Sequence, residues 1–175
     1  MEMSRKRNRP GLVSTSVLVL AAAFSCAPVV AQEAQPVYTM TVIIDAAHGQ
    51  KVAAGKYDRA IAKLSAKRFS TDAYSDHTNL CVAYTKTGEI EKATVACEAA
   101  VAAMRKKPIT RNKSFVPAHQ VVANRMYLAL ALSNLGVLDV VKGESEAARE
   151  KFEEAIALDA KISAPKVNIA RLARI

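Results

Sequence analysis

Hydrophobic and polar residues follow a helical period along most of the chain. Between residues 118 and 142, apolar side chains fall on one side of a helix, at Val121, Leu128, Leu132 and Leu135. Steps of three, four and seven residues are typical of one face of an α-helix. Alanine is abundant and glycine and proline are few, which favours closely packed helices. We therefore predict an all-α fold with one long helix over 118–142, well above the usual length of about 11–12 residues.

The run from Val37 to Ile44 has a different character. It is rich in β-branched residues, which fit an extended backbone better than a helix. We expect a linker or extended segment over 32–40 and a helical domain from residue 41 to residue 175.

A short motif recurs along this domain. Asn79-Leu80-Cys81 returns as Asn134-Leu135-Gly136 and as Asn168-Ile169-Ala170. The second step, from 134 to 168, is 34, and the first, from 79 to 134, is 55, which is 34 plus an insert of 21. The larger offset also relates Gly88 to Gly143, Ala93 to Ala148, Cys97 to Phe152 and Ala100 to Ala155. A fixed period of this size is the signature of a repeat architecture.

The recurring residues resemble the tetratricopeptide repeat family, whose pattern is Leu-Gly-x-x-Tyr on one helix and Ala-x-x-x-Phe on the next. One unit reads Leu80-Cys81-x-x-Tyr84, then Ala93-x-x-x-Cys97; the next reads Leu135-Gly136-x-x-Asp139, then Ala148-x-x-x-Phe152. The resemblance implies a short right-handed α-solenoid of helical hairpins. Its units are a degenerate unit 41–70, unit 72–106, a basic insert 107–117, unit 118–160 and a terminal half unit 163–175. Gly88 and Gly143 are expected to turn in the left-handed conformation.

Residues 1–31 have the order of a secretory signal peptide. Four basic residues up to Arg9 precede an uncharged, largely apolar run, and Val29-Val30-Ala31 offers small residues for cleavage. Two alternatives stay open: an uncleaved membrane anchor, and a lipoprotein signal ending at Cys26. All three place the domain outside the cytoplasm, in the periplasm or secreted.

Charge changes this picture little. The formal net charge is +9, and it falls to +6 when residues 1–31, which carry four basic residues and Glu2, are removed. No nucleic-acid motif accompanies the excess, so nucleic acid is not an expected partner. Five basic side chains gather around the insert, at Arg105, Lys106, Lys107, Arg111 and Lys113. Membrane association is expected only through this loop or the N-terminal segment.

The domain keeps two cysteines, Cys81 and Cys97, on the two helices of one predicted hairpin. An oxidising compartment permits a disulfide between them, and two buried free thiols are the other interpretation. Candidate chemistry is otherwise missing. The three histidines have no metal-ligand spacing with Cys, Asp or Glu, and no phosphate loop or nucleophile motif is present. We expect no enzyme, no metal and no cofactor.

The expected function is therefore a protein-interaction scaffold or adaptor outside the cytoplasm that binds a protein or peptide. The alternative is an envelope-associated structural protein, held as a lipoprotein or by a membrane anchor. The long helix carries a second apolar stripe, which we predict to face the concave side of the repeats. With two residues of the preceding unit, the candidate partner-binding set is Val82, Thr85, Val122, Met126, Leu130, Ser133, Val137, Val140 and Val141. Its occupant is a peptide or helix, a second copy in a homodimer, or a part of this chain that folds back as cover, either Val37–Ile44 or the insert.

Overall fold

The computed structural model describes residues 37–66, 73–110 and 116–173, all within one unit that spans Gln35–Ile175. The described residues are helical apart from turns and extended segments, without a β-strand. The helices in chain order are α1 (Gly49–Ala53), α2 (Tyr57–Ser65), α3 (Ala73–Thr87), α4 (Ile90–Arg105), α5 (Ala118–Val141), α6 (Ser145–Leu158) and α7 (Ser163–Leu172). The predicted all-α class is confirmed, and the predicted long helix corresponds to α5.

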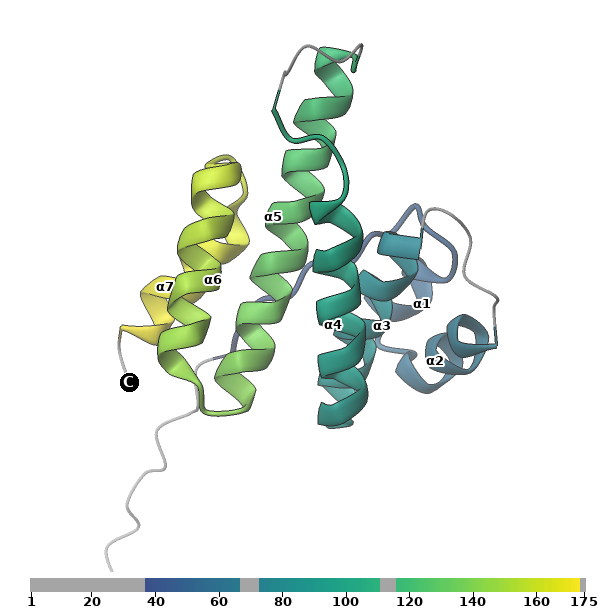
Figure 1. The fold of residues 1–175 in the computed structure, drawn as a ribbon. Helices are drawn as coiled ribbons and strands as arrows, with labels where there is room; N and C mark the ends of the chain where they lie inside the picture. Colours follow the sequence, from purple (N-terminus) through teal and green to yellow (C-terminus); the bar gives the residue numbers. More distant parts are fainter. Residues whose placement is uncertain (1–36, 67–72, 111–115, 174–175) are drawn as a thin grey trace, which may run out of the picture. The chain divides into compact units, whose positions relative to one another are not determined.

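The helices form two layers (Figure 1). The pairs α3–α4 and α5–α6 pack as hairpins, and α4 packs on α5. Between hairpins, α1 contacts α3, α3 contacts α5, and α5 contacts α7, so the odd-numbered helices form one continuous layer. Among the described even-numbered helices, α4 and α6 are linked by an ion pair between Arg105 and Glu154 at 3.1 Å, without the close backbone approach that joins the odd-numbered helices. The odd-numbered layer is therefore the more tightly packed of the two.

Both main hairpins turn at a glycine, as predicted. Gly88 has φ +77° and Gly143 has φ +82°, a region that costs an L-residue strain. The N–H of Glu89 donates to the carbonyl of Tyr84 at 3.0 Å, and that of Glu144 to the carbonyl of Asp139 at 2.8 Å. These bonds satisfy carbonyls that the ends of α3 and α5 would otherwise leave unpaired.

Small residues let paired helices approach closely. At Gly136 of α5, an added Cβ would lie 2.7 Å from the ring of Phe152 and 3.1 Å from the carbonyl oxygen of Ala148 on α6. Phe152 is fully buried in this contact. Gly136 thus sets the separation of α5 and α6, and the equivalent position of α3 is Cys81.

The central helix α5 is, among the described helices, long and apolar enough to cross a membrane by length and composition alone. Leu132 and Leu138 of this helix are fully buried in two different core clusters of the protein. The composition of α5 is therefore accounted for by its central place, since it contacts α3, α4, α6 and α7.

The N-terminal boundary of the helical region differs from the prediction. The first helix begins at Gly49 rather than at residue 41, and residues 37–43 are neither helix nor strand. The β-branched run of Val37 to Ile44 is the reason, because such residues fit an extended backbone. Residues 37–40 are also not a free linker, since they contact the helices. The predicted signal peptide lies outside the described residues.

The basic insert is described only in part. Arg105 is the last residue of α4 rather than a loop residue, and it donates to Glu154 of α6 at 3.1 Å. The side chain of Asn124 on α5 donates to the carbonyl of Pro108 at 2.9 Å, which ties the start of the insert to α5. Arg111 and Lys113 lie outside the described residues.

Candidate functional site

Three asparagines stand at equivalent places on the odd-numbered helices: Asn79 on α3, Asn134 on α5 and Asn168 on α7. Each opens one copy of the recurring motif, and each is fully buried. A buried carboxamide costs free energy unless its oxygen and nitrogen both find partners. We call the face of α3, α5 and α7 that carries these three residues the ladder face.

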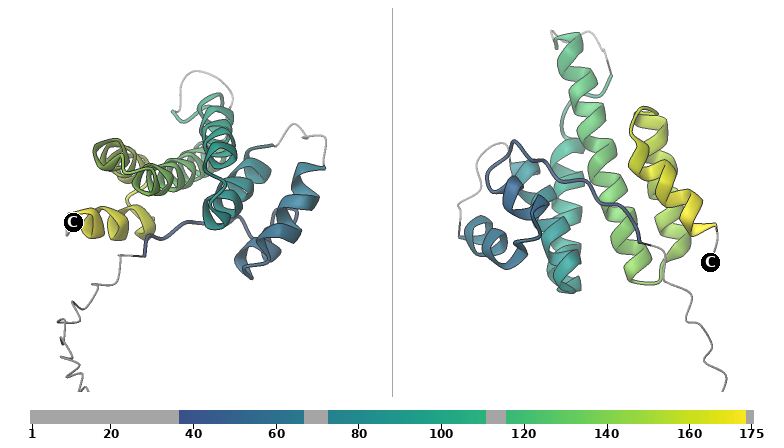
Figure 2. Two further views of the ribbon diagram at one scale, coloured as in Figure 1. Left: turned by 90° about the horizontal axis from the view of Figure 1, so that it is seen from below. Right: turned by 180° about the vertical axis from the view of Figure 1, so that it is seen from behind.

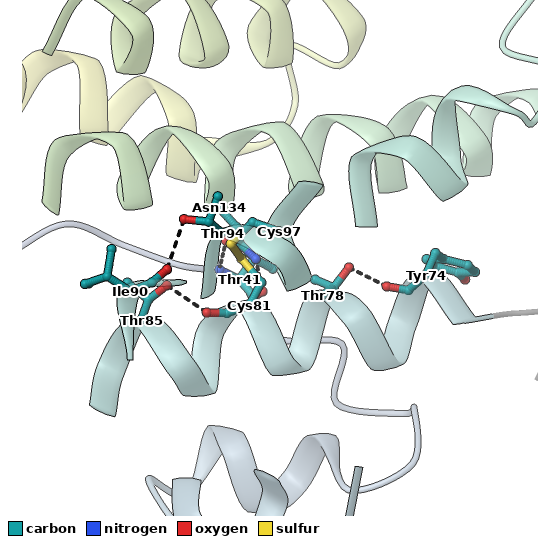
Figure 3. The surroundings of a disulfide bond; sticks show 9 residues. All are labelled: Thr41, Tyr74, Thr78, Cys81, Thr85, Ile90, Thr94, Cys97 and Asn134. Atoms are coloured by element: carbon teal, nitrogen blue, oxygen red, sulfur yellow. Dashed lines mark hydrogen bonds between the residues drawn. A yellow bond between two sulfur atoms is a disulfide. The ribbon is translucent and has the colours of Figure 1, made fainter. Parts of the chain in front are cut away.

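Each asparagine holds one residue of the segment Val37–Ile44, which we call the extended segment. Asn134 accepts from the N–H of Thr41 at 2.7 Å and donates to its carbonyl at 2.8 Å (Figure 3). Asn168 accepts from Thr39 at 2.8 Å and donates to its carbonyl at 2.8 Å. Asn79 accepts from Ile43 at 2.9 Å and donates to its carbonyl at 3.1 Å. Each asparagine thus forms a matched pair of hydrogen bonds with the backbone of a single residue. We call each such pair a rung and the three rungs together the asparagine ladder.

The spacing of the rungs fits an extended backbone. Residues 39, 41 and 43 alternate with residues that are not in the ladder, and in an extended chain every second residue presents its N–H and carbonyl on the same side. The segment crosses the array from α7 towards α3 as the chain proceeds (Figure 2, right). One rung is therefore supplied by each repeated helix in turn.

The intervening side chains are apolar and pack into the helices. Tyr38 packs on the cluster that contains Val137 and Leu172. Met40 contacts three core clusters, and Val42 contacts the cluster that contains Val82. The segment therefore buries apolar surface through its even-numbered residues while its odd-numbered residues are held by their backbone.

Arg171 of α7 fixes the first described residues of the segment. Its guanidinium donates to the carbonyl of Val37 and, at 3.1 Å, to the hydroxyl of Thr39. The neighbouring Tyr38 has its pKa raised by burial, an effect that the positive charge of Arg171 opposes. The Tyr38 hydroxyl has no hydrogen-bond partner among the described residues.

The predicted partner-binding residues divide into three groups by exposure. Val82, Ser133 and Val137 are buried; Thr85, Met126, Leu130 and Val140 are half-buried; Val122 and Val141 are exposed. Val82 and Val137 lie in the clusters onto which Val42 and Tyr38 pack. The extended segment, one of the occupants expected from the sequence, thus packs over part of the predicted apolar stripe.

A disulfide joins Cys81 of α3 to Cys97 of α4, with their Cα atoms 4.7 Å apart. That separation lies within the range that a disulfide bridges without backbone movement. The bond lies beside the middle rung, with Thr41 and Asn134 in its surroundings (Figure 3). Cys81 follows Asn79 by two residues, so the covalent link also holds the helix that supplies a rung.

Charged and metal-ligating groups form no second centre within the part of the chain that the structure describes. No three His, Cys, Asp or Glu side chains come together there in a way that would hold a metal ion. His77 has its pKa lowered, chiefly by burial, with Asp76 acting in the opposite direction. Buried Asp139 has its pKa raised, chiefly by burial, and Lys142 at 3.9 Å acts against this. His77 and Asp139 lie on different helices, α3 and α5.

The three asparagines mark the repeat in the sequence, but the repeat pattern alone does not assign them a role. The signal was available: a polar residue recurs at one position of each motif, directly before an apolar one. A carboxamide at a buried helix position indicates a bonding partner from outside the helix. Which segment supplies that partner does not follow from the periodicity.

Comparison with known proteins does not add to this geometry. No family model, curated protein or solved structure matches the chain.

Proposed function

We propose that this chain is a protein-interaction scaffold that acts outside the cytoplasm and binds an extended segment of a protein or peptide on its ladder face. The observation that carries the proposal is the ladder itself. Three equivalent carboxamides pair with both backbone groups of alternate residues in an extended segment. Binding of this kind is typical of a peptide-recognition surface, because backbone bonds supply affinity and side-chain contacts supply selectivity.

The repeat architecture supports the same proposal. We infer a tetratricopeptide-type α-solenoid with right-handed stacking from the recurring motif, the glycine turns and the hairpin order. In that architecture each unit repeats the same surface position, which explains why one asparagine per unit lines up. The place of action is inferred from the signal-like pattern of residues 1–31 and agrees with a disulfide, which persists in oxidising compartments.

Site-specific photocrosslinking tests this function. A photoreactive residue at Leu130, half-buried four residues before Asn134, reports on the ladder face, and one at the exposed Val95 of α4 is the matched control. Both are placed in the chain from residue 32 and exposed to an envelope extract. Each is made with and without Thr41→Pro, which removes the N–H that Asn134 accepts from and so loosens the extended segment.

We expect discrete adducts from position 130 in at least one of the two chains, with the crosslink mapped to an extended stretch of the partner. Asn134→Ala should remove them, and position 95 should give none. Absence of adducts from position 130 in both chains contradicts the proposed function, and so do adducts that persist after Asn134→Ala.

A further inference from the structure

We propose that the extended segment is a displaceable internal ligand, and that the ladder face accepts in its place a second extended peptide with apolar side chains at alternate positions. This inference rests on the proposed function and adds to it the class of ligand and a means of control. The occupant of the site is visible: residues 37–44 fill it within the same chain.

The main contacts of the segment do not depend on its sequence. Six of its hydrogen bonds join asparagine side chains to backbone N–H and carbonyl groups, which every residue but proline carries. The ladder therefore has no means of telling this chain's backbone from that of another extended peptide. It does exclude proline, and any N-alkylated residue, at the places of Thr39, Thr41 and Ile43.

Selectivity comes from the residues between the rungs. Tyr38 packs on one core cluster of the helices and Val42 on another. Met40 contacts both of these clusters and a third one. Val37 and Ile44, at the two ends, are 73% and 52% exposed and contribute little packing. The expected ligand thus has an aromatic residue, a flexible apolar residue and a β-branched residue at alternate positions, with unconstrained residues outside them.

The two ends of the segment are held differently. Beyond Ile43 the chain turns tightly into α1, and a Cβ at Gly49 would lie 2.0 Å from the Ile43 carbonyl oxygen, so that end is locked by close packing. At the other end Arg171 makes exposed hydrogen bonds to Val37 and Thr39. A competing peptide therefore displaces the segment from Val37 inwards, one rung at a time.

Because the segment is covalently attached to α1, its effective concentration at the ladder face is high, and a free peptide binds weakly while it is seated. Anything that withdraws the segment raises the affinity for a peptide added in trans without a new contact. Control of the site thus requires no second binding site and no change in the helices.

The test uses the chain from residue 32 and a fluorescent peptide with the sequence of residues 37–44. Peptide binding is measured by fluorescence anisotropy to three chains: unsubstituted, Thr41→Pro, and Ile44→Pro. Ile44→Pro is the control, because Ile44 is exposed and follows the last residue whose N–H donates to an asparagine of the ladder face. Circular dichroism checks that each chain keeps its helices, and Thr39→Pro, which breaks only the outermost rung, replaces Thr41→Pro if the latter loses them.

We expect the Thr41→Pro chain to bind the peptide at least about tenfold more tightly than the other two. In the same chain, a peptide N-methylated at its Thr41 should bind at least about tenfold more weakly than one N-methylated at its Val42, since only the former loses a rung. Equal affinity of all three chains, or equal loss with both methylated peptides, overturns the proposal. Equal photocrosslinking from Leu130 in the chains with and without Thr41→Pro likewise overturns internal competition while leaving the proposed function standing. If neither chain gives adducts, both the proposed function and the internal competition are contradicted.

Discussion

The carboxamide of Asn134 and the backbone of Thr41 hold each other through two hydrogen bonds of 2.7 and 2.8 Å across 93 positions of sequence. Asn134 lies on the central helix α5 and Thr41 precedes the first helix, so this pair ties the start of the domain to its middle. The rungs at Asn79 and Asn168 repeat the arrangement on either side. The ladder is thus both the attachment of the N-terminal segment and the site proposed to bind peptides.

Asn134→Ala should lower the free energy of unfolding by about 1–3 kcal/mol, because it leaves the N–H and carbonyl of Thr41 without their partners. It should also speed chymotrypsin cleavage after Tyr38, since the middle of the segment is released. Asn124→Ala is the control: Asn124 is a buried asparagine of the same helix that bonds Pro108 instead. Equal acceleration of cleavage at Tyr38 by both substitutions would show that Asn134 does not specifically hold the segment.

Removing the disulfide should destabilise the domain without changing its helices. Cys81 and Cys97 are 16 positions apart. A disulfide that closes a loop of about 15 residues stabilises the folded state by roughly 3 kcal/mol, because it lowers the conformational entropy of the unfolded chain. We expect Cys81→Ala with Cys97→Ala to lower the free energy of unfolding in denaturant titrations by about that amount. A reducing agent should bring the unsubstituted protein to the same midpoint and leave the double variant unchanged. A midpoint of the unsubstituted protein that ignores the reductant would contradict this.

Gly136→Ala separates helix propensity from packing. Propensity alone predicts a gain of about 1 kcal/mol, because alanine favours a helix more than glycine does. The close approach of Phe152 and the Ala148 carbonyl predicts a net loss of about 1–3 kcal/mol instead. Thermal unfolding decides the sign. Phe152→Leu in the Gly136→Ala background should cost less than in the original protein, and strict additivity of the two substitutions would argue against the contact.

Asp139 should make stability fall as pH rises. Burial raises its folded-state pKa above the ordinary value of 3.8, with smaller opposing effects of Lys142 and Lys151 and supporting effects of Glu144 and Glu98. The folded state then binds more protons than the unfolded state between the two pKa values, so its stability decreases with rising pH through that window.

Asp139→Asn should therefore raise the melting temperature at pH 7, and the advantage should shrink as pH falls towards 3.8, the ordinary pKa of the carboxyl group. The exposed Glu150→Gln is the control and should show no comparable trend. A melting-temperature difference between Asp139→Asn and the unsubstituted chain that is constant from pH 4 to pH 7 would contradict the account.

Local pattern was enough to predict most of the helices. The apolar period placed α5 at nearly its observed bounds, and the spacing of Gly88 and Gly143 placed both hairpin turns. These features depend on residues close together in sequence, where periodicity and turn chemistry act directly. The helix start predicted at residue 41 was wrong, because extended conformation at Thr41 is completed by a partner 93 positions away.

The site was foreseen only in outline. Val82 and Val137 belong to the surface on which the extended segment packs. The sequence left several occupants open for this surface, and the segment was one of them. The asparagines that hold it were noticed only as markers of the repeat. Their role depends on stacking α3, α5 and α7 so that three carboxamides align, which is a tertiary relationship that a single sequence does not express.

Amide hydrogen exchange across the extended segment, followed residue by residue by NMR, tests the central claim most directly. The ladder predicts slow exchange at Thr39, Thr41 and Ile43, whose N–H groups donate to buried asparagines, and fast exchange at the intervening Met40 and Val42. Asn134→Ala should raise the rate at Thr41 most. Uniform fast exchange from residue 37 to residue 44, or slow exchange without alternation, would contradict the asparagine ladder.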